Sequence, residues 1–183
     1  MPGRRTTFLA GEFHHLYNRG VDRGAIFFSD DNYRYFMRLL MGKAERHAVD
    51  VVAFCLMPNH YHILIRPSVD NTVSPFINSL LGSFVQGRNA ARHRVGPLSQ
   101  GRYKSVHVDR DEYLAHLARY IHLNPVAAGL VALPQDWPYS NYGDVLEDGV
   151  LIGGIFPDGA AYQRFVEMPQ PPKLPGSLEL PGS

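Results

Sequence analysis

The chain of 183 residues is poor in the features that mark secreted and membrane proteins. It has one cysteine, Cys55, which excludes a disulfide framework within the chain and argues against a cysteine-based zinc site. No stretch reaches the roughly 18 continuous apolar residues of a membrane span, and the first residues, MPGRRTTFLAGEF, lack the apolar core of a signal peptide. With 45% apolar and 19% charged residues, we expect a soluble cytoplasmic protein with one sizeable domain.

The chain also lacks an overall excess of charge, since its net charge is +1. This balance hides an uneven distribution. Residues 1–110 carry 15 basic and 8 acidic residues, a net of +7, whereas residues 111–183 carry 3 and 9, a net of −6. The stretch from Arg88 to Arg110 is the most basic. A basic half suggests a phosphate-rich partner such as a nucleic acid, and a solvated charged surface is the alternative interpretation.

The hydrophobic pattern predicts a β-α-β-β-α-β order followed by helices. Strands are expected at residues 11–20, 49–57, 60–67 and 103–108, and helices at 29–47, 73–93 and 110–124, the last of them ended by Pro125. This order favours an α+β, ferredoxin-like βαββαβ fold: one antiparallel sheet, helices on one face and a C-terminal helical extension. We assign residues 1–165 to this domain and the proline-rich residues 166–183 to a flexible tail.

The stretch CLMPNHYHILI at residues 55–65 contains two histidines on one expected strand. Side chains two residues apart on a strand point to the same face, so His60 and His62 lie side by side while Tyr61 and Ile63 face the core. Two neutral imidazoles can bind one divalent metal ion if a third ligand comes from elsewhere. The alternative is a pair of buried, hydrogen-bonded histidines with a structural role.

A second candidate group lies on the helix expected at residues 110–124. Tyr113, Tyr120 and Asn124 share one stripe of this helix, with spacings of seven and four residues. A phenol is a possible covalent nucleophile, and an amide oxygen is an acceptable ligand for magnesium or manganese. Alternatively, Tyr120 is a core residue with a satisfied hydroxyl, and Asn124 merely ends the helix before Pro125.

Three motifs in this order decide between these alternatives: MPNHYHILI, GRYKSVHVDRDEYL and RYIHLNPVAAGLV. Together with YNRGVDRGAIF and DNYRYFMRLL near the N-terminus, they resemble the REP-associated tyrosine transposases, in the single-tyrosine branch of the His-hydrophobic-His transposases and relaxases. The resemblance covers roughly residues 12–143. It departs from the family pattern at Ala127, where arginine is usual, and at PYSNY, residues 138–142, where WSSY is usual.

The resemblance implies the ferredoxin-like fold and a complete catalytic site. Tyr120 would be the nucleophile, and His60, His62 and Asn124 would bind a divalent metal ion, Mg²⁺ or Mn²⁺. The reaction would be cleavage and rejoining of single-stranded DNA beside a hairpin, through a 5′-phosphotyrosine link, in the nucleoid region of a bacterial cytoplasm. The residues expected to contact DNA phosphates and bases are Arg19, Arg23, Arg88, Arg92, Arg102, Tyr103 and Lys104.

Other functions compatible with parts of this pattern are kept as alternatives. One is a domesticated relative that holds hairpin DNA and no longer cuts it. Another is a rolling-circle replication initiator or plasmid relaxase, for which the chain lacks a helicase or other extra domain. A ligand-binding or regulatory ferredoxin-like domain would leave the three motifs unexplained. A monomer is favoured over a homodimer.

Overall fold

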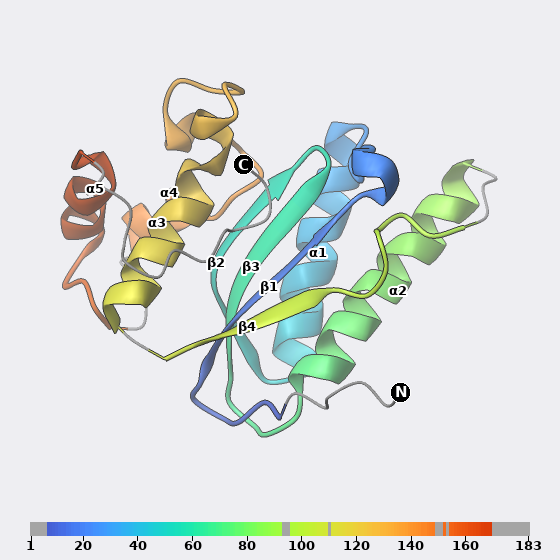
Figure 1. Cartoon of the computed structure of the whole chain (residues 1–183), viewed down its shortest axis with the longest axis horizontal. Helices are drawn as coiled ribbons and strands as arrows, with labels where there is room; N and C mark the ends of the chain where they lie inside the picture. Colours follow the sequence, from blue (N-terminus) through green and yellow to red (C-terminus); the bar gives the residue numbers. More distant parts are fainter. Residues whose placement is uncertain (1–6, 93–95, 110, 149–151, 153, 170–183) are drawn as a thin grey trace.

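The computed structural model describes residues 7–92, 96–109, 111–148, 152 and 154–169, and its elements follow the expected order (Figure 1). The strands are β1 (Phe13–Arg19), β2 (Val49–Met57), β3 (His60–Pro67) and β4 (Lys104–Val108). The helices are α1 (Asp30–Arg46), α2 (Val73–Arg92), α3 (Asp111–Ala127), α4 (Tyr142–Asp148) and α5 (Gly159–Glu167), with short 3₁₀ turns η1 (Val21–Arg23) and η2 (Pro134–Asp136). All neighbouring strands are antiparallel, in the order β2-β3-β1-β4, which confirms the predicted ferredoxin-like sheet.

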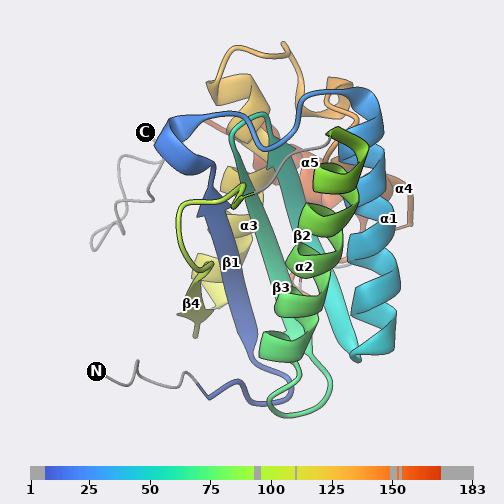
Figure 2. The ribbon, with the colours of Figure 1, turned by 90° about the vertical axis from the view of Figure 1, so that its right-hand side faces the viewer.

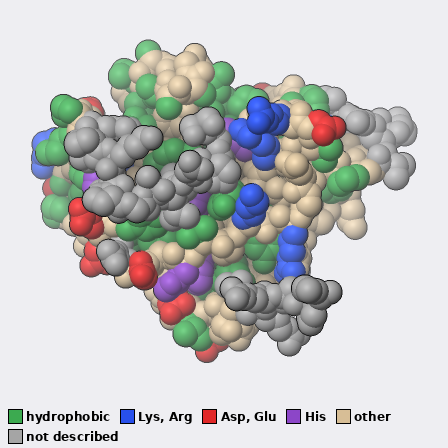
Figure 3. Space-filling view, viewed as in Figure 1, with side chains coloured by type: hydrophobic (Ala, Val, Ile, Leu, Met, Phe, Trp, Pro, Cys, Tyr) green, Lys and Arg blue, Asp and Glu red, His purple; other side chains and the backbone are tan. Residues whose placement is uncertain are grey.

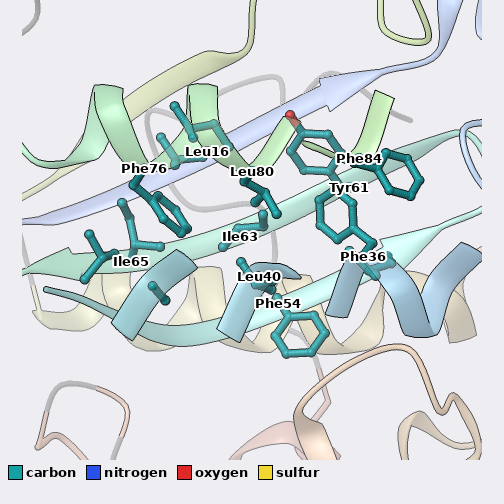
Figure 4. Close-up of a cluster of buried hydrophobic side chains, with 14 of the residues drawn as sticks. Leu16, Phe36, Leu40, Phe54, Tyr61, Ile63, Ile65, Phe76, Leu80 and Phe84 are labelled. Carbon is teal, nitrogen blue, oxygen red and sulfur yellow. The ribbon is translucent and has the colours of Figure 1, made fainter. Parts of the chain in front are cut away.

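Helices α1 and α2 cover one face of the sheet and enclose the larger core (Figures 2 and 4). Tyr61 and Ile63 of β3 are fully buried in this core, as the strand alternation predicted. Glycine weakens a helix, yet α2 contains Gly87 at its contact with α1. A Cβ atom there would lie 2.6 Å from the hydroxyl oxygen of Tyr35, so the glycine lets the two helices approach closely.

The turn between β2 and β3 is held by the loop that follows β1. The backbone N–H of Gly20 donates to the carbonyl of Asn59 at 2.8 Å, and that of Ile26 donates to the carbonyl of Pro58 at 2.8 Å. Backbone hydrogen bonds on both turn residues fix the direction in which β3 begins. The first residue of β3 is His60.

Helix α3 lies on the opposite face of the sheet from α1 and α2 (Figure 2), a placement that the sequence left open. The prediction that Pro125 ends this helix is wrong, because α3 continues to Ala127 and the chain then turns at Gly129, with a φ of +69°. Proline this close to the helix end removes only the hydrogen bond to the carbonyl of Ile121. Its own carbonyl accepts from the N–H of Leu130 at 2.9 Å.

A chain of buried hydrogen bonds joins α3 to the edge of β2 through Asn141. The side-chain oxygen of Asn141 accepts from the N–H of Phe54 at 2.7 Å and from Nε2 of His122 at 3.0 Å, and its amide nitrogen donates to the carbonyl of Val52 at 3.2 Å. Because an amide oxygen can only accept, His122 carries its proton on Nε2. Its Nδ1 therefore accepts from the hydroxyl of Tyr162 on α5, at 2.7 Å.

The C-terminal helices pack outside α3 and complete the smaller core, to which Tyr162 and Val166 of α5 contribute. The predicted domain boundary between residues 165 and 166 thus falls inside α5, which ends at Glu167. Residues 170–183, most of the predicted tail, lie outside the described residues. Within the described ranges, no helix is both long and apolar enough to cross a bilayer.

We predict that Asn141→Ala lowers the free energy of unfolding by about 3 kcal/mol or more. The substitution leaves the N–H of Phe54, Nε2 of His122 and the carbonyl of Val52 buried without their partner. Urea unfolding measures the effect. The control is Gln163→Ala, which removes an exposed hydrogen bond on α5 and should cost less than about 0.5 kcal/mol. Equal stability of the two variants would contradict the prediction.

We also predict that acid weakens the fold before carboxylates titrate. Burial lowers the pKa of His122 from 6.5 to about 4. Below pH 6.5 the unfolded chain therefore binds a proton that the folded chain excludes, and stability falls as the pH drops toward 4, by about 1.4 kcal/mol per pH unit for each such group. The buried His14 and His15, each with a pKa of about 4, act in the same direction. Urea unfolding at several pH values gives the slope of the unfolding free energy against pH, which should be shallower for His122→Gln. An unchanged slope would contradict the lowered pKa of His122.

Candidate active site

The two motif histidines lie at the start of β3, on the face that α3 covers. In the sheet, His60 is paired with Arg19 and His62 with Tyr17, both on β1. Directly paired residues share a face, so these four side chains project together toward α3. From α3, Asn124 reaches His60 and Tyr120 reaches His62. The structure thus brings together the four residues of the predicted catalytic site.

The proton of His60 is placed by its neighbour Asn59. Nδ1 of His60 lies 2.7 Å from the side-chain oxygen of Asn59, whose amide nitrogen donates to the carbonyl of Arg23 at 3.3 Å. The oxygen can only accept, so Nδ1 carries the hydrogen and Nε2 keeps its lone pair. That Nε2 faces the side-chain oxygen of Asn124 at 3.3 Å. The imidazole nitrogen and the amide oxygen are both atoms that can bind a cation.

His62 is almost completely buried and has one free ring nitrogen. Its Nδ1 lies 2.9 Å from Nε2 of His15 on β1. Its Nε2 has no hydrogen-bond partner among the described residues. The ring of Tyr120 stands nearly perpendicular to that of His62, with ring centres 5.5 Å apart, and the centre of the His60 ring is 5.1 Å from that of His62. The unpaired nitrogen therefore belongs to the same cluster as the phenol.

Burial keeps the site histidines neutral near pH 7. It lowers the pKa of His60, against a smaller opposite effect of the Asn124 oxygen, which would accept a hydrogen bond from the protonated ring. The pKa of His62 falls well below its usual value, chiefly through burial and further through its neighbours His15 and His60. A neutral imidazole is the form that binds a metal ion.

These donors fit a divalent metal ion. Nε2 of His60 and the side-chain oxygen of Asn124 each offer a lone pair, and Nε2 of His62 offers a third when the proton of that ring is on Nδ1. No carboxylate belongs to this set, and among the described residues no cluster of three or more His, Cys, Asp or Glu side chains could hold a metal ion. Three protein ligands leave coordination positions open for phosphate oxygens or water, as in catalytic metal sites. Mixed nitrogen and oxygen donors suit Mn²⁺ better than Mg²⁺.

Two of the predicted DNA-contacting residues lie on the face of the site. Arg19 is paired with His60, and Lys104, at the start of β4, is paired with Tyr17, its ammonium 5.9 Å from the centre of the Tyr17 ring. Figure 3 shows Lys and Arg side chains along the β1 and β4 side of the molecule. Arg23 and Arg102 are exposed. The basic surface next to the histidines thus comes mainly from two adjacent strands.

Other predicted DNA-contacting residues lie elsewhere. Tyr103 packs against the core under α1 and α2, and its hydroxyl lies 3.3 Å from that of Ser74. Arg88 is buried, with its guanidinium carbon 4.2 Å from the centre of the Phe28 ring. Arg92 is the last residue of α2, and its side chain lies outside the described part of the chain. Their role in DNA binding stays a prediction.

Three residues at the site were missed by the sequence reasoning: His15, Tyr17 and Asn59. The signal for the first two was present, because His15, Tyr17 and Arg19 alternate on the first expected strand. In a ferredoxin-like sheet this strand lies beside the one that carries the histidine pair. No sequence pattern distinguishes Asn59 as the partner of His60, since its role depends on the side-chain geometry of the turn.

Comparison with known proteins gives matches to one family. Residues 14–124 match the family model described as "Transposase IS200 like". A Haemophilus influenzae protein named as a REP-associated tyrosine transposase is 30% identical over 108 residues. The match spans 54% of this chain and 61% of that protein, so the chain covers about three-fifths of the length of its relative.

Two solved structures match this chain to different degrees. One is a REP-associated tyrosine transposase bound to a REP hairpin: the TM-score is 0.69 at 19% identity, over 82% of this chain and 88% of the other. The second, a transposase from Deinococcus radiodurans, gives a TM-score of 0.45 at 19% identity, over 66% of this chain and 93% of the other. At this identity the first likeness shows that the fold is shared.

Proposed function

Because the chain belongs to the IS200-like transposase family, we propose that it is a metal-dependent, single-strand DNA endonuclease and strand transferase that acts next to DNA hairpins. The relative with a TM-score of 0.69 was solved with a REP hairpin, which supports a hairpin as the feature that places the substrate. This substrate would bring the protein to the bacterial nucleoid.

One observation carries the proposal: elements far apart in the chain bring together a phenol, two imidazoles and an amide, the groups that the reaction needs. Tyr120 packs against His62, and Asn124, one helical turn further along α3, faces His60. Some sixty residues separate the strand from the helix in the sequence. The buried Nε2 of His62 has no partner among the described residues, and a metal ion would supply one.

The reaction follows from the chemistry of these groups. The Tyr120 oxygen attacks the phosphorus of a DNA phosphodiester, so that an O–P bond forms to the tyrosine and the bond from phosphorus to the 3′ oxygen breaks. The phenol proton passes to water, and the departing oxygen takes up a proton to become a 3′-hydroxyl. A divalent metal ion supplies charge neutralisation at the non-bridging oxygens when bound. Another 3′-hydroxyl then attacks the 5′-phosphotyrosine and restores the tyrosine, so no nucleotide cofactor is consumed.

The strand to be cut would run across β1 and β4. Lys104 and Arg19 lie on the face of the site, and such side chains attract phosphates and set the position of a strand without reading its sequence. The ring of Tyr17 lies between Lys104 and His62 and could stack on an unpaired base. The binding surface would therefore lead directly to the tyrosine.

A single chain would be sufficient for this chemistry. The nucleophile and all three metal ligands come from β3 and α3 of the same molecule. Helix α3 packs on the sheet of its own chain through the bond from His122 to Asn141. This packing supports a monomer as the active form.

A second function, hairpin binding without cleavage, is favoured by one observation alone: the structural relative holds a hairpin. It predicts DNA binding that is independent of Tyr120 and of metal ions. The experiment below separates the two functions.

We predict that the protein forms a covalent adduct with a labelled, hairpin-bearing single strand in the presence of Mn²⁺, detected in a denaturing gel. Tyr120→Phe should reduce the adduct by roughly 1,000-fold or more, since it removes the attacking oxygen. Tyr113→Phe is the matched control, because it changes the same residue type on the same helix, two turns away. An adduct that persists in Tyr120→Phe would refute the nucleophile, and tight binding with no adduct in the unmodified protein would favour the binding function.

We further predict that Lys104→Ala weakens binding of the same strand and makes it less sensitive to salt. The loss of one phosphate contact should reduce the slope of log affinity against log salt concentration by about 0.7. Fluorescence anisotropy at several salt concentrations measures the slope. The control is Arg34→Ala, which removes one positive charge from α1, where Arg34 is paired with Asp30. An equal change in both variants would show that the strand does not cross β4.

A further inference from the structure

We propose that His15 is a positioning residue that keeps the proton of His62 on Nδ1, so that Nε2 of His62 presents its lone pair to the metal ion. The inference rests on the metal site of the proposed function and deepens it. His15 would touch neither DNA nor metal, and would act only through His62.

The geometry for this role is direct. His15 is fully buried on β1, and its Nε2 lies 2.9 Å from Nδ1 of His62. The two rings are stacked, with centres 5.1 Å apart and an angle of 21° between their planes. One hydrogen lies between these two nitrogens. Which ring carries it decides whether His62 can bind a metal ion.

Each of the two possibilities leaves one buried N–H without a partner, and a metal ion bound at His62 favours one of them. If His15 carried the hydrogen, His62 would hold its own proton on Nε2, where no partner is found among the described residues. A protonated ring nitrogen cannot bind a metal, and a buried N–H without a partner costs about 1–3 kcal/mol. If His62 carries the hydrogen on Nδ1, Nε2 is a lone pair that a metal ion satisfies. His15 then carries its own hydrogen on Nδ1, which is buried and has no partner among the described residues, so the unpaired N–H belongs to His15 instead of His62.

The neighbouring ligand follows the same pattern without ambiguity. His60 donates from Nδ1 to the side-chain oxygen of Asn59 and keeps Nε2 for the metal. With the hydrogen of His62 also on Nδ1, both imidazoles would be held from outside the site and both Nε2 atoms would point inward. Metal-ligating histidines generally donate their other N–H to such a partner, and its loss weakens metal binding by about 10–100-fold.

The position of the proton can be measured in the protein saturated with Mg²⁺, which is diamagnetic. Nitrogen–proton NMR spectra of histidine-labelled protein distinguish a protonated from an unprotonated ring nitrogen. We expect His62 to carry its hydrogen on Nδ1. A hydrogen found on Nε2 of His62 would overturn the inference without any variant having been made.

Metal affinity provides the second readout. Calorimetric titration with Mn²⁺ should show binding about 10–100-fold weaker for His15→Leu, which removes the acceptor. His15→Gln restores an acceptor at a similar distance from the backbone and should stay within a few-fold of the unmodified protein. His14→Gln is the matched control, since His14 is also buried on β1 but faces the other side of the sheet. Affinity unchanged in His15→Leu, or lowered as much in His14→Gln, would overturn the inference.

The failure of this inference differs from that of the proposed function, because Mn²⁺ binding requires neither DNA nor the Tyr120 hydroxyl. The inference fails alone if His15→Leu binds Mn²⁺ normally while the Tyr120 adduct still forms. The proposed function fails alone if no adduct forms although Mn²⁺ binds in a manner that depends on His15.

Discussion

The hydrogen bond between His122 and Asn141 is the interaction on which the site depends, because it sets the position of α3 on the sheet. His122 lies midway between Tyr120 and Asn124 on that helix. Residues two apart on a helix point to different sides, so holding His122 against Asn141 turns the tyrosine and the amide toward β3. The same Asn141 is bonded to the backbone of β2 through Phe54 and Val52. A local network in the smaller core therefore determines the geometry of a site beside it.

Strand β3 serves the core and the site with alternate residues. Tyr61 and Ile63 are fully buried under α1 and α2, while His60 and His62 face α3. The core residues fix the strand, since a shift of one residue would exchange the two faces and expose the apolar side chains. Rigid support is what a metal site needs, because ligands must stay close to one geometry. The backbone bonds between the loop after β1 and the turn before His60 add to that support.

Much of this arrangement could be predicted from the sequence, for identifiable reasons. Alternation on a strand placed His60 and His62 together, and helical spacing placed Tyr120 and Asn124 together, because both periodicities are local. The meeting of the two pairs is a tertiary fact, and only the family motifs anticipated it. The predicted helix end at Pro125 was wrong, because α3 continues to Ala127. In the last turn of a helix a proline removes only one backbone hydrogen bond, so the helix can continue past it.

Side-chain partnerships were beyond the sequence. Alternation could place His15 on the same face as Tyr17 and Arg19, but the contact of its ring with His62 depends on the pairing of β1 with β3 and on rotamers. Tyr103 was grouped with Arg102 and Lys104 by proximity in the chain, yet it packs in the core under α1 and α2. The basic composition of the stretch from Arg88 to Arg110 likewise does not indicate which of its side chains are buried, and Arg88 is buried.

The segment that carries Asn141 also has a consequence for the sheet as a whole. Leu56 donates its backbone N–H to the carbonyl of Tyr139, Cys55 is bridged to Ser140, and the indole of Trp137 donates to the carbonyl of Leu56. This half of β2 is thus already occupied on its outer side, and β4 is the other border of the sheet. A stretch of strand whose backbone groups are already bonded cannot serve as a template for a strand of another chain. The segment that orients α3 therefore also protects this part of β2 from edge-to-edge pairing.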